Sequence, residues 1–373
     1  MSQFTTRNTP YLNIVSFDVP YPPNYGGVID IFYKLKALHD KGVKIILHCF
    51  VYADRKPDEE LKNFCEQVYY YIRNEKLSAH VSLNPYIIQS RKDKQLLENL
   101  LSNDYPILFE GLHSCGWLDH PGLKHRKKLL RMHNIEWKYY LDLVPQAKSF
   151  KQKAYYLFES YKLRQFENKL RHANWIFSVS DRETDYCGRF AKSSWLPAFH
   201  GNTLIEFNPS SGSEKYVIFH GNLDIEDNRI AARLLDDICA ELNVKCVIAG
   251  KNINQPFFTR HSSLVSNPQT GEMQQLIQNS HICFVYSAFA NGIKLKLLYS
   301  LFTGRHVISN KEAVAGTKLE ELVILANTRE EIKQAITEYL KIDLSEAEYN
   351  RRKELLQQYY DNAKNADIII RQL

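Results

Sequence analysis

Residues 216–251, YVIFHGNLDIEDNRIAARLLDDICAELNVKCVIAGK, predict a strand, a helix and a second strand in that order. The apolar runs 216–222 and 245–251 have the length of buried strands, and the segment 227–242 between them has the pattern of a helix. A unit of this kind indicates a mainly parallel sheet with helices packed on it.

The alternation of apolar runs and amphipathic stretches continues on both sides of this unit. Further strands are expected at 11–18, 44–50, 68–73, 105–111, 128–134, 175–180, 281–287 and 306–310. Further helices are expected at 28–42, 91–104, 149–174, 272–280, 292–304 and 329–341. The sequence therefore predicts an α/β chain with two successive, doubly wound, Rossmann-like domains.

A break separates the two series of elements. Residues 195–215, WLPAFHGNTLIEFNPSSGSEK, contain Pro, Gly and Ser without a clear period, which predicts a linker. We place the first domain at 1–195, the linker at 196–215 and the second domain at 216–345. Because ligands of open α/β sheets bind beyond the carboxyl ends of the strands, we expect the two domains to face a central cleft.

The composition is that of a globular chain. Of 373 residues, 44% are hydrophobic and 24% are charged, and the length suits two domains of roughly 150–200 residues. No apolar stretch approaches the roughly 18–20 residues of a membrane span, and the N-terminus lacks the pattern of a secretory signal. Seven cysteines without a CxxC pair argue against a zinc site or a disulfide framework, which favours reduced thiols in a cytoplasm.

The net charge of +6 is mild and does not indicate nucleic-acid binding. The densest basic run, LKHRKKLLRMH (123–133), passes directly into a predicted strand, so a solvated loop is favoured over a nucleic-acid surface. Contact of this run with an anionic membrane face that carries a lipid-linked acceptor stays open as an alternative.

Glycines open two predicted helices. Gly26 and Gly27 follow the first strand, where a backbone without Cβ can approach a ligand and the first N–H groups of the helix attract anions. This loop is a candidate for phosphate or acceptor contact, and a tight turn without a ligand is the alternative. The spacing is not GxGxxG, which argues against a nicotinamide or flavin dinucleotide.

The second glycine turn lies in SAFANGIKLKLL. Asn291 and Gly292 form the turn, Ile293 and Lys294 begin the helix, and Lys296 follows in its first turn. Lysine is unfavourable at that end of the helix dipole, and a bound diphosphate would explain both lysines. Side chains that point to solvent are the alternative.

The segment NGIKLKLLYSLFTGRHVI (291–308) resembles the signature of glycosyltransferase family 4, with Gly292, Leu298, Gly304 and Val307 among the matching positions. Four more segments resemble the family in the same order along the chain. They are RMHNIEWKYY (131–140), KLRHANWIFSVSDRET (169–184), FHGNLDIEDN (219–228) and VIAGK (247–251).

The resemblance implies a GT-B fold and a retaining transfer from a nucleotide-activated sugar, without a metal or another cofactor. No Asp-x-Asp metal motif occurs in the chain. The donor is expected on the second domain and the acceptor on the first, and the terminal segment 346–373 is expected to form a helix that crosses back to the first domain. The expected donor contacts are Gly221, Asn222, Lys251, Gly292, Ile293, Lys294, Lys296 and Tyr299.

His133 and Asn291 are the candidate catalytic residues. His133 ends a predicted strand, where a neutral imidazole can take or share a proton. A histidine bonded to a neighbouring carbonyl is the alternative. Candidates for the acceptor side are His113, Asn134 and Glu136.

Four donor-contacting charges of the family are absent. The two glutamate positions hold Asn291 and Tyr299, and the phosphate-binding Arg and Lys positions hold Asn222 and Asp227. Lys294 could replace the cation, and Asn291 could bond a sugar hydroxyl. A divergent active enzyme is therefore favoured over an inactive one.

The expected function is the transfer of a hexose from a UDP- or GDP-sugar to a growing surface glycan, such as capsule, lipopolysaccharide or exopolysaccharide. The enzyme is expected in the cytoplasm, free or peripheral on the inner membrane face, with a glycan or lipid-linked acceptor and no nucleic acid. One alternative is a non-catalytic glycosyltransferase-like protein that binds a partner enzyme or glycan. Another is a nucleotide-sugar epimerase, against which the family signature argues.

Overall fold

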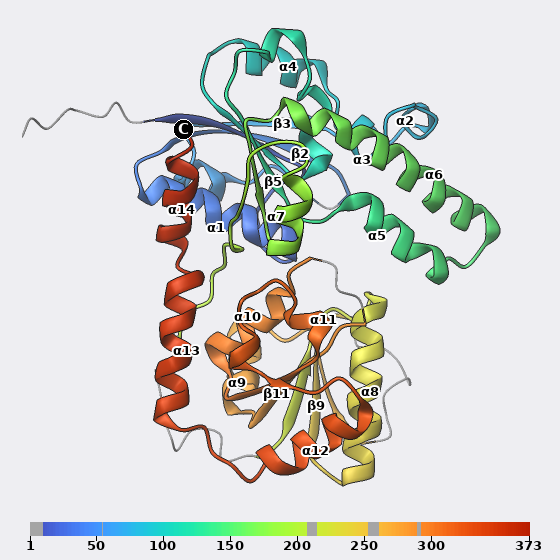
Figure 1. Cartoon of the computed structure of the whole chain (residues 1–373), viewed down its shortest axis with the longest axis vertical. Coiled ribbons are helices and arrows are strands. Elements are labelled where there is room, and N and C mark those ends of the chain that lie inside the picture. The colour runs from blue at the N-terminus through green and yellow to red at the C-terminus, as the bar shows by residue number, and fades with distance from the viewer. Residues whose placement is uncertain (1–9, 54, 207–214, 253–260, 289–291) are drawn as a thin grey trace, which may run out of the picture. The chain divides into compact units, whose positions relative to one another are not determined.

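The computed structural model describes residues 10–53, 55–206, 215–252, 261–288 and 292–373. These residues form two compact units (Figure 1). Unit 1 runs to His200 and also contains Asp361–Leu373, and unit 2 is Gly201–Tyr360. The unit boundaries therefore fall at 200/201 and 360/361, later in the chain than the domain ends that the sequence predicts.

Unit 1 is built on a parallel seven-stranded sheet with the order β3-β2-β1-β4-β5-β6-β7. Its strands are β1 (Tyr11–Ser16), β2 (Lys44–Val51), β3 (Gln67–Ile72), β4 (Ile107–Glu110), β5 (Lys128–Met132), β6 (Trp175–Ser178) and β7 (Ser193–Trp195). Its helices are α1 (Gly26–Asp40), α2 (Leu77–His80), α3 (Tyr86–Gln89), α4 (Lys94–Leu101), α5 (Glu136–Leu143), α6 (Phe150–Phe166), α7 (Asp181–Cys187) and α14 (Asn362–Ile370).

Unit 2 is built on a parallel six-stranded sheet with the order β10-β9-β8-β11-β12-β13. Its strands are β8 (Val217–His220), β9 (Cys246–Gly250), β10 (Ser263–Ser266), β11 (Ile282–Val285), β12 (His306–Ser309) and β13 (Ile324–Leu325). Its helices are α8 (Glu226–Leu242), α9 (Thr270–Asn279), α10 (Leu295–Thr303), α11 (Lys311–Val314), α12 (Arg329–Tyr339) and α13 (Glu346–Tyr359).

Each sheet has an apolar core on both faces, because successive side chains of a strand point to opposite sides. In β1, Leu12 and Ile14 belong to one core and Val15 to the other. In β8, Val217 and Phe219 face one core, and Ile218 faces the other. Strands that are buried on both faces explain why the sequence shows continuous apolar runs rather than alternation.

A glycine fixes the first crossover of unit 2. Gly250 ends β9 with φ +152°, and a Cβ built there would lie 1.8 Å from the carbonyl oxygen of Gly221. No side chain fits at that distance, and φ in this region favours glycine. The close approach of the chain after β8 to the end of β9 therefore requires glycine at position 250.

The chain terminus differs from the single predicted helix. Residues 346–373 form two helices, of which α13 belongs to unit 2 and α14 to unit 1. α14 packs on α1 (Figure 1), with Ala366 and Ile369 in the core that also contains Leu38. Lys41 Nζ and Asp367 Oδ2 form an ion pair of 2.8 Å at the edge of this contact.

None of the described helices is both long enough and apolar enough to cross a membrane.

Candidate functional site

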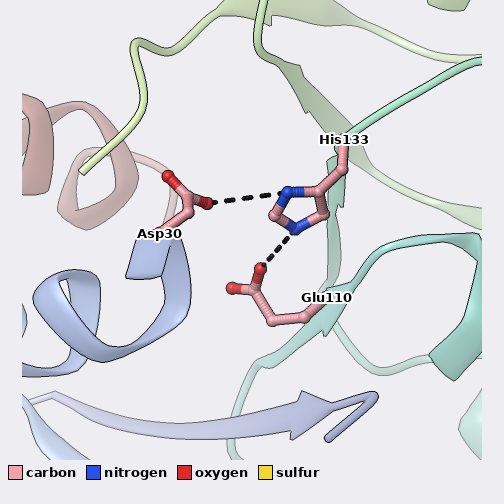
Figure 2. Close-up of side chains that lie close together, drawn as sticks. All are labelled: Asp30, Glu110 and His133. Carbon is pink, nitrogen blue, oxygen red and sulfur yellow. Dashed lines mark hydrogen bonds and ion pairs between the residues drawn. The ribbon is translucent and has the colours of Figure 1, made fainter. Parts of the chain in front are cut away.

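A group of five charged or ionisable side chains, which we call the His133 cluster, lies at the carboxyl ends of β4 and β5. Glu110 is the last residue of β4, and His133 follows the end of β5. Asp30 and Lys34 come from neighbouring turns of α1, and Arg131 comes from β5 itself. In Figure 2 the carboxylates of Asp30 and Glu110 point toward the two nitrogens of the His133 ring.

His133 is the member of the cluster that reaches solvent. Its Nε2 lies 3.2 Å from Glu110 Oε2, and its Nδ1 lies 3.9 Å from Asp30 Oδ2. The side chain of His133 is 14% exposed, against 3% for Asp30 and 0% for Glu110. An imidazole with one exposed edge and carboxylates at its nitrogens is suited to hold a proton and to pass it to a bound molecule.

Lys34 and Arg131 balance the two carboxylates. Lys34 Nζ is 2.9 Å from Asp30 Oδ2 and 2.7 Å from Glu110 Oε1, and Arg131 Nε is 3.1 Å from Asp30 Oδ2. Burial alone would raise the pKa of Asp30, but the charges of Arg131 and Lys34 outweigh it and hold that pKa far below its usual value. The cluster is therefore neutral without a proton on His133.

Asp30 and Arg131 also bind the segment that leaves the sheet of unit 1. Asp30 Oδ1 accepts a hydrogen bond of 2.8 Å from the backbone N–H of Phe199. Arg131 donates to the carbonyl oxygens of Leu196 and Pro197. The cluster thus connects α1, β4 and β5 to the last residues before unit 2.

The cluster has the residue types of a metal site but already contains a cation. One ligand atom each from Asp30, Glu110 and His133 lie within 4.8 Å of one another. The ammonium group of Lys34 donates hydrogen bonds to Asp30 and to both oxygens of Glu110. A divalent ion would have to displace this buried lysine. The carboxylates of Asp30 and Glu110 therefore fit the ammonium group of Lys34 better than a metal ion.

A second group of ionisable residues lies next to the cluster. Glu136 begins α5, and its Oε1 is 4.0 Å from His113 Nδ1. Burial raises the pKa of Glu136 to about 8, and burial likewise raises the pKa of Glu183 to about 7. Among the residues that the structure describes, His113 Nδ1 and Glu183 Oε2 have no hydrogen-bond partner. Buried polar atoms without partners suit a site for a ligand with many hydroxyl groups.

Gly111 allows the two histidines to approach each other. It follows β4 with φ +69°, and a Cβ there would lie 3.1 Å from His113 Nδ1 and 3.6 Å from His133 Cδ2. The ring of Phe17 packs against both, with centroid distances of 5.2 Å to His113 and 5.7 Å to His133. His113, His133 and Phe17 therefore form one wall at the carboxyl edge of the sheet.

The raised pKa of Glu136 predicts that stability depends on pH. The carboxyl ionises near pH 4.3 in the unfolded chain and near 8 in the folded chain, so the unfolded state loses its proton first as pH rises. We expect Glu136→Gln to gain stability over the wild type progressively between about pH 5 and pH 8. Urea unfolding at several pH values measures this gain, with the exposed Glu98→Gln as control. A pH-independent difference would contradict a buried, protonated Glu136.

The remaining candidates of unit 1 lie close to this edge. Gly26 and Gly27 are the first two residues of α1, and a Cβ on Gly27 would meet the Phe17 ring at 2.6 Å. Gly27 thus makes room for an aromatic ring of the site wall. Asn134 hydrogen-bonds Glu136. The structure therefore brings His113, His133 and their neighbours together at one edge of the sheet, and their part in acceptor binding stays a prediction.

In unit 2, the two lysines of the glycine turn have protein partners. Lys294 is the N-cap of α10, and its Nζ is 3.7 Å from Asp227 Oδ2. Lys296 is partly buried and donates hydrogen bonds of 2.9 Å to Asn228 Oδ1 and 3.1 Å to the carbonyl of Tyr286. Burial lowers the pKa of Lys296 to about 8. These contacts explain the position of Lys296 without a diphosphate. Lys294 is likewise partly buried, with 17% of its side chain exposed.

The other donor-side candidates occupy the carboxyl edge of β8, β9 and β11. Gly292 has φ +60°, which fits the predicted turn, and Ile293 next to it is partly buried. Tyr299 packs edge-on against His220, with ring centroids 5.7 Å apart. The side chain of Asn222 caps its own turn through the N–H of Asp224, and Lys251 is exposed. Asn291, the second candidate catalytic residue, lies outside the described residues.

Sequence reasoning missed Asp30, Lys34, Glu110 and Arg131. One signal was present, because Asp30 and Lys34 lie at an i, i+4 spacing beside the apolar stripe of a predicted helix. Glu110, likewise, ends an otherwise apolar strand. A buried acid or base in such a position requires a partner, but the sequence does not say which one.

The two parallel α/β units define the GT-B fold, as the sequence predicts. The trehalose-6-phosphate synthase OtsA has the same fold, with a TM-score of 0.67 and 10% identity over 96% of this chain and 98% of that one. HepE from Anabaena in complex with UDP-glucose matches with a TM-score of 0.65 and 13% identity over 97% and 98% of the two chains.

In sequence, the chain is similar to a Klebsiella pneumoniae protein described as an "uncharacterized 44.6 kDa protein in cps region". The two are 26% identical over 389 residues, which cover 94% of this chain and 96% of the relative. No protein-family model matches the chain.

Proposed function

We propose that the chain is a retaining glycosyltransferase that moves a hexose from a UDP- or GDP-sugar to a growing surface glycan. The observation that carries the proposal is the His133 cluster on a GT-B fold. It offers one partly exposed imidazole, fixed by two buried carboxylates, at the edge where α/β sheets bind ligands.

In this proposal His133 lies beside the reacting sugar and takes or shares a proton there. Glu110 and Asp30 orient the ring through its two nitrogens, and Lys34 keeps both carboxylates ionised. His113, Asn134 and Glu136 bind hydroxyl groups of the acceptor, since a protonated Glu136 can donate a hydrogen bond as well as accept one.

The donor is proposed to bind unit 2, with its diphosphate at Gly292 and Lys294. Lys294 supplies the positive charge for the leaving nucleotide, and no metal or other cofactor takes part. UDP-glucose in the HepE complex supports a nucleotide-sugar donor, and the words "cps region" in the description of the Klebsiella relative support a surface polysaccharide product. A lipid-linked acceptor would bring the enzyme to the inner face of a membrane.

A non-catalytic sugar- or partner-binding protein is the second candidate, favoured by one observation. Asp227 occupies a position where glycosyltransferase family 4, which the sequence resembles, has a cation. Its carboxylate accepts hydrogen bonds from Ser287 Oγ and Ala288 N and forms an ion pair with Lys294. A carboxylate at this point repels a diphosphate. If the protein is an enzyme, Lys294 has to leave Asp227 and bind the diphosphate of the donor.

Nucleotide binding distinguishes the two candidates. Calorimetric titration with UDP, GDP and their hexose derivatives is expected to show binding of one nucleotide. Lys294→Ala should weaken that binding by about 1.5–3 kcal/mol, the scale of a charge-assisted hydrogen bond. The exposed Lys353→Ala on α13 should bind as the wild type does. Binding of no nucleotide would favour the non-catalytic candidate, and unchanged affinity in folded Lys294→Ala would remove this lysine from the site.

A further inference from the structure

The helix α6 carries an apolar stripe on its solvent side. Phe150, Leu157, Phe158 and Tyr161 are 84%, 51%, 57% and 61% exposed. Together with the exposed Ala154, they follow the spacing i, i+4, i+7, i+8, i+11 of one helix face. The opposite face is buried through Glu159, Ser160, Leu163 and Phe166. The apolar stripe therefore lies on the side of the helix that does not pack within unit 1.

A second segment extends this stripe. Leu77, Val81 and Leu83 are 77%, 76% and 94% exposed. Lys162 Nζ holds the segment against α6 through the carbonyl oxygens of Ser82, at 3.2 Å, and of Asn84. In Figure 1, α2 lies beside α6, and α5 and α6 extend as a hairpin from the rest of unit 1.

The charges around the stripe are basic. Lys148, Lys151 and Lys153 at the start of α6 and Arg164 near its end are exposed. The one acidic residue of residues 148–165, Glu159, is buried and pairs with Lys162. An exposed apolar surface rimmed by lysine and arginine matches the interface of an anionic membrane, where side chains insert among acyl chains and cations meet phosphate groups.

We propose that the exposed residues of 77–83 and of 148–164, the α6 surface, dock unit 1 on an anionic phospholipid membrane. Aromatic and aliphatic side chains enter the interface, and the four cations contact lipid headgroups. The inference assigns a surface to the membrane contact named in the proposed function, and it is tested separately from sugar transfer, because vesicle binding is measured without donor or acceptor.

The basic run 123–133 is not this surface. Arg126 is buried and donates to the carbonyls of Leu100 and Tyr105, and Lys128 Nζ donates to the carbonyl of Leu118 at 3.0 Å. Arg131 belongs to the His133 cluster. Three of the five lysines and arginines in the run thus serve the interior, which leaves too little exposed charge for a docking site.

Sedimentation with vesicles tests the proposal on the full chain. The wild type is expected to bind vesicles of phosphatidylcholine with phosphatidylglycerol and to bind phosphatidylcholine alone more weakly. Phe150→Ser/Phe158→Ser should weaken binding roughly tenfold or more, since two aromatic side chains leave the interface. Lys151→Glu/Lys153→Glu should weaken binding to the anionic vesicles selectively. Ile225→Ser/Ile342→Ser, which changes exposed apolar residues of unit 2, is the matched control.

Three results would overturn the proposal. They are no binding of the wild type to anionic vesicles, wild-type affinity of the folded Phe150→Ser/Phe158→Ser variant, and an equal loss of vesicle binding in the unit 2 control.

Analytical ultracentrifugation tests whether a second copy of the chain binds the α6 surface instead. Self-association of the wild type that the Phe150→Ser/Phe158→Ser variant loses would show that a second copy, and not a membrane, covers the α6 surface. Circular dichroism confirms that each variant is folded.

Discussion

Replacement of His133 by alanine is expected to lower the rate of sugar transfer by roughly 10²–10⁴-fold, the usual contribution of a positioned acid or base. The ring is the exposed member of a cluster whose other members are buried, and its two nitrogens lie 3.2 Å and 3.9 Å from carboxylate oxygens. Removal of the ring takes away the proton carrier and leaves Lys34 and Arg131 to neutralise Asp30 and Glu110. The fold should therefore survive the change.

The measurement is the turnover number with the nucleotide sugar that binds in the titrations. Nucleotide affinity should be unchanged, because the donor is proposed to bind unit 2. His125→Ala is the matched control, since this histidine is exposed and lies near the start of β5 without a part in the cluster. Equal turnover of His133→Ala and the wild type would show that the cluster is structural only.

The fold could be predicted from the sequence because its strands are continuous apolar runs. In β1 and β8 both faces are buried, so the runs stand out from the amphipathic helices between them. Short elements were missed where this contrast is weak. The edge strand β7 has the sequence SSW and is partly exposed along its length, and the edge strand β10 has the sequence SLVS and is exposed or partly exposed along its length. Neither has the pattern of a buried element.

The candidate site could be predicted only in part, for a different physical reason. His133 was found because it ends a predicted strand, and Glu136 because it follows that strand, and both lie in a segment that resembles the family. Their partners come from distant parts of the chain, since Lys34 and Glu110 are 76 positions apart and Asp30 and Arg131 are 101 apart. The local sequence shows that a charged residue lies among apolar ones. Only the folded chain shows which residue of opposite charge is its partner.

The lysines of unit 2 show the converse. Both were noted as unfavourable at the start of a helix, and a ligand was the explanation that the sequence suggested. The structure supplies Asp227 for Lys294, and Asn228 and a carbonyl group for Lys296. Asp227 occupies a position where glycosyltransferase family 4, which the sequence resembles, has a cation. The negative charge of Asp227 is balanced by the positive charge of Lys294. The two residues lie in different segments, so neither segment alone shows that they form a pair.

The second large effect is expected from Asp30→Ala, which should lower the free energy of unfolding of unit 1 by about 3–5 kcal/mol. The carboxylate of Asp30 is 3% exposed and binds Arg131, Lys34 and the N–H of Phe199. Its loss leaves Arg131 buried without its carboxylate, and an unpaired buried charge costs more than the pair contributes. A domain is commonly stable by only about 5–15 kcal/mol, so the loss would be a large share of the total.

The tryptophans make the measurement specific. All four, Trp117, Trp137, Trp175 and Trp195, belong to unit 1, so their fluorescence in a urea titration follows this unit and not unit 2. Asp40→Ala on the exposed side of the same helix is the control and should shift stability by less than about 0.5 kcal/mol. Asp30→Asn should fall between the two, because an amide oxygen can still accept from Phe199 N–H but cannot neutralise Arg131. If Asp30→Ala unfolds at the urea concentration of the control, the buried ion pairs do not hold α1 to the sheet.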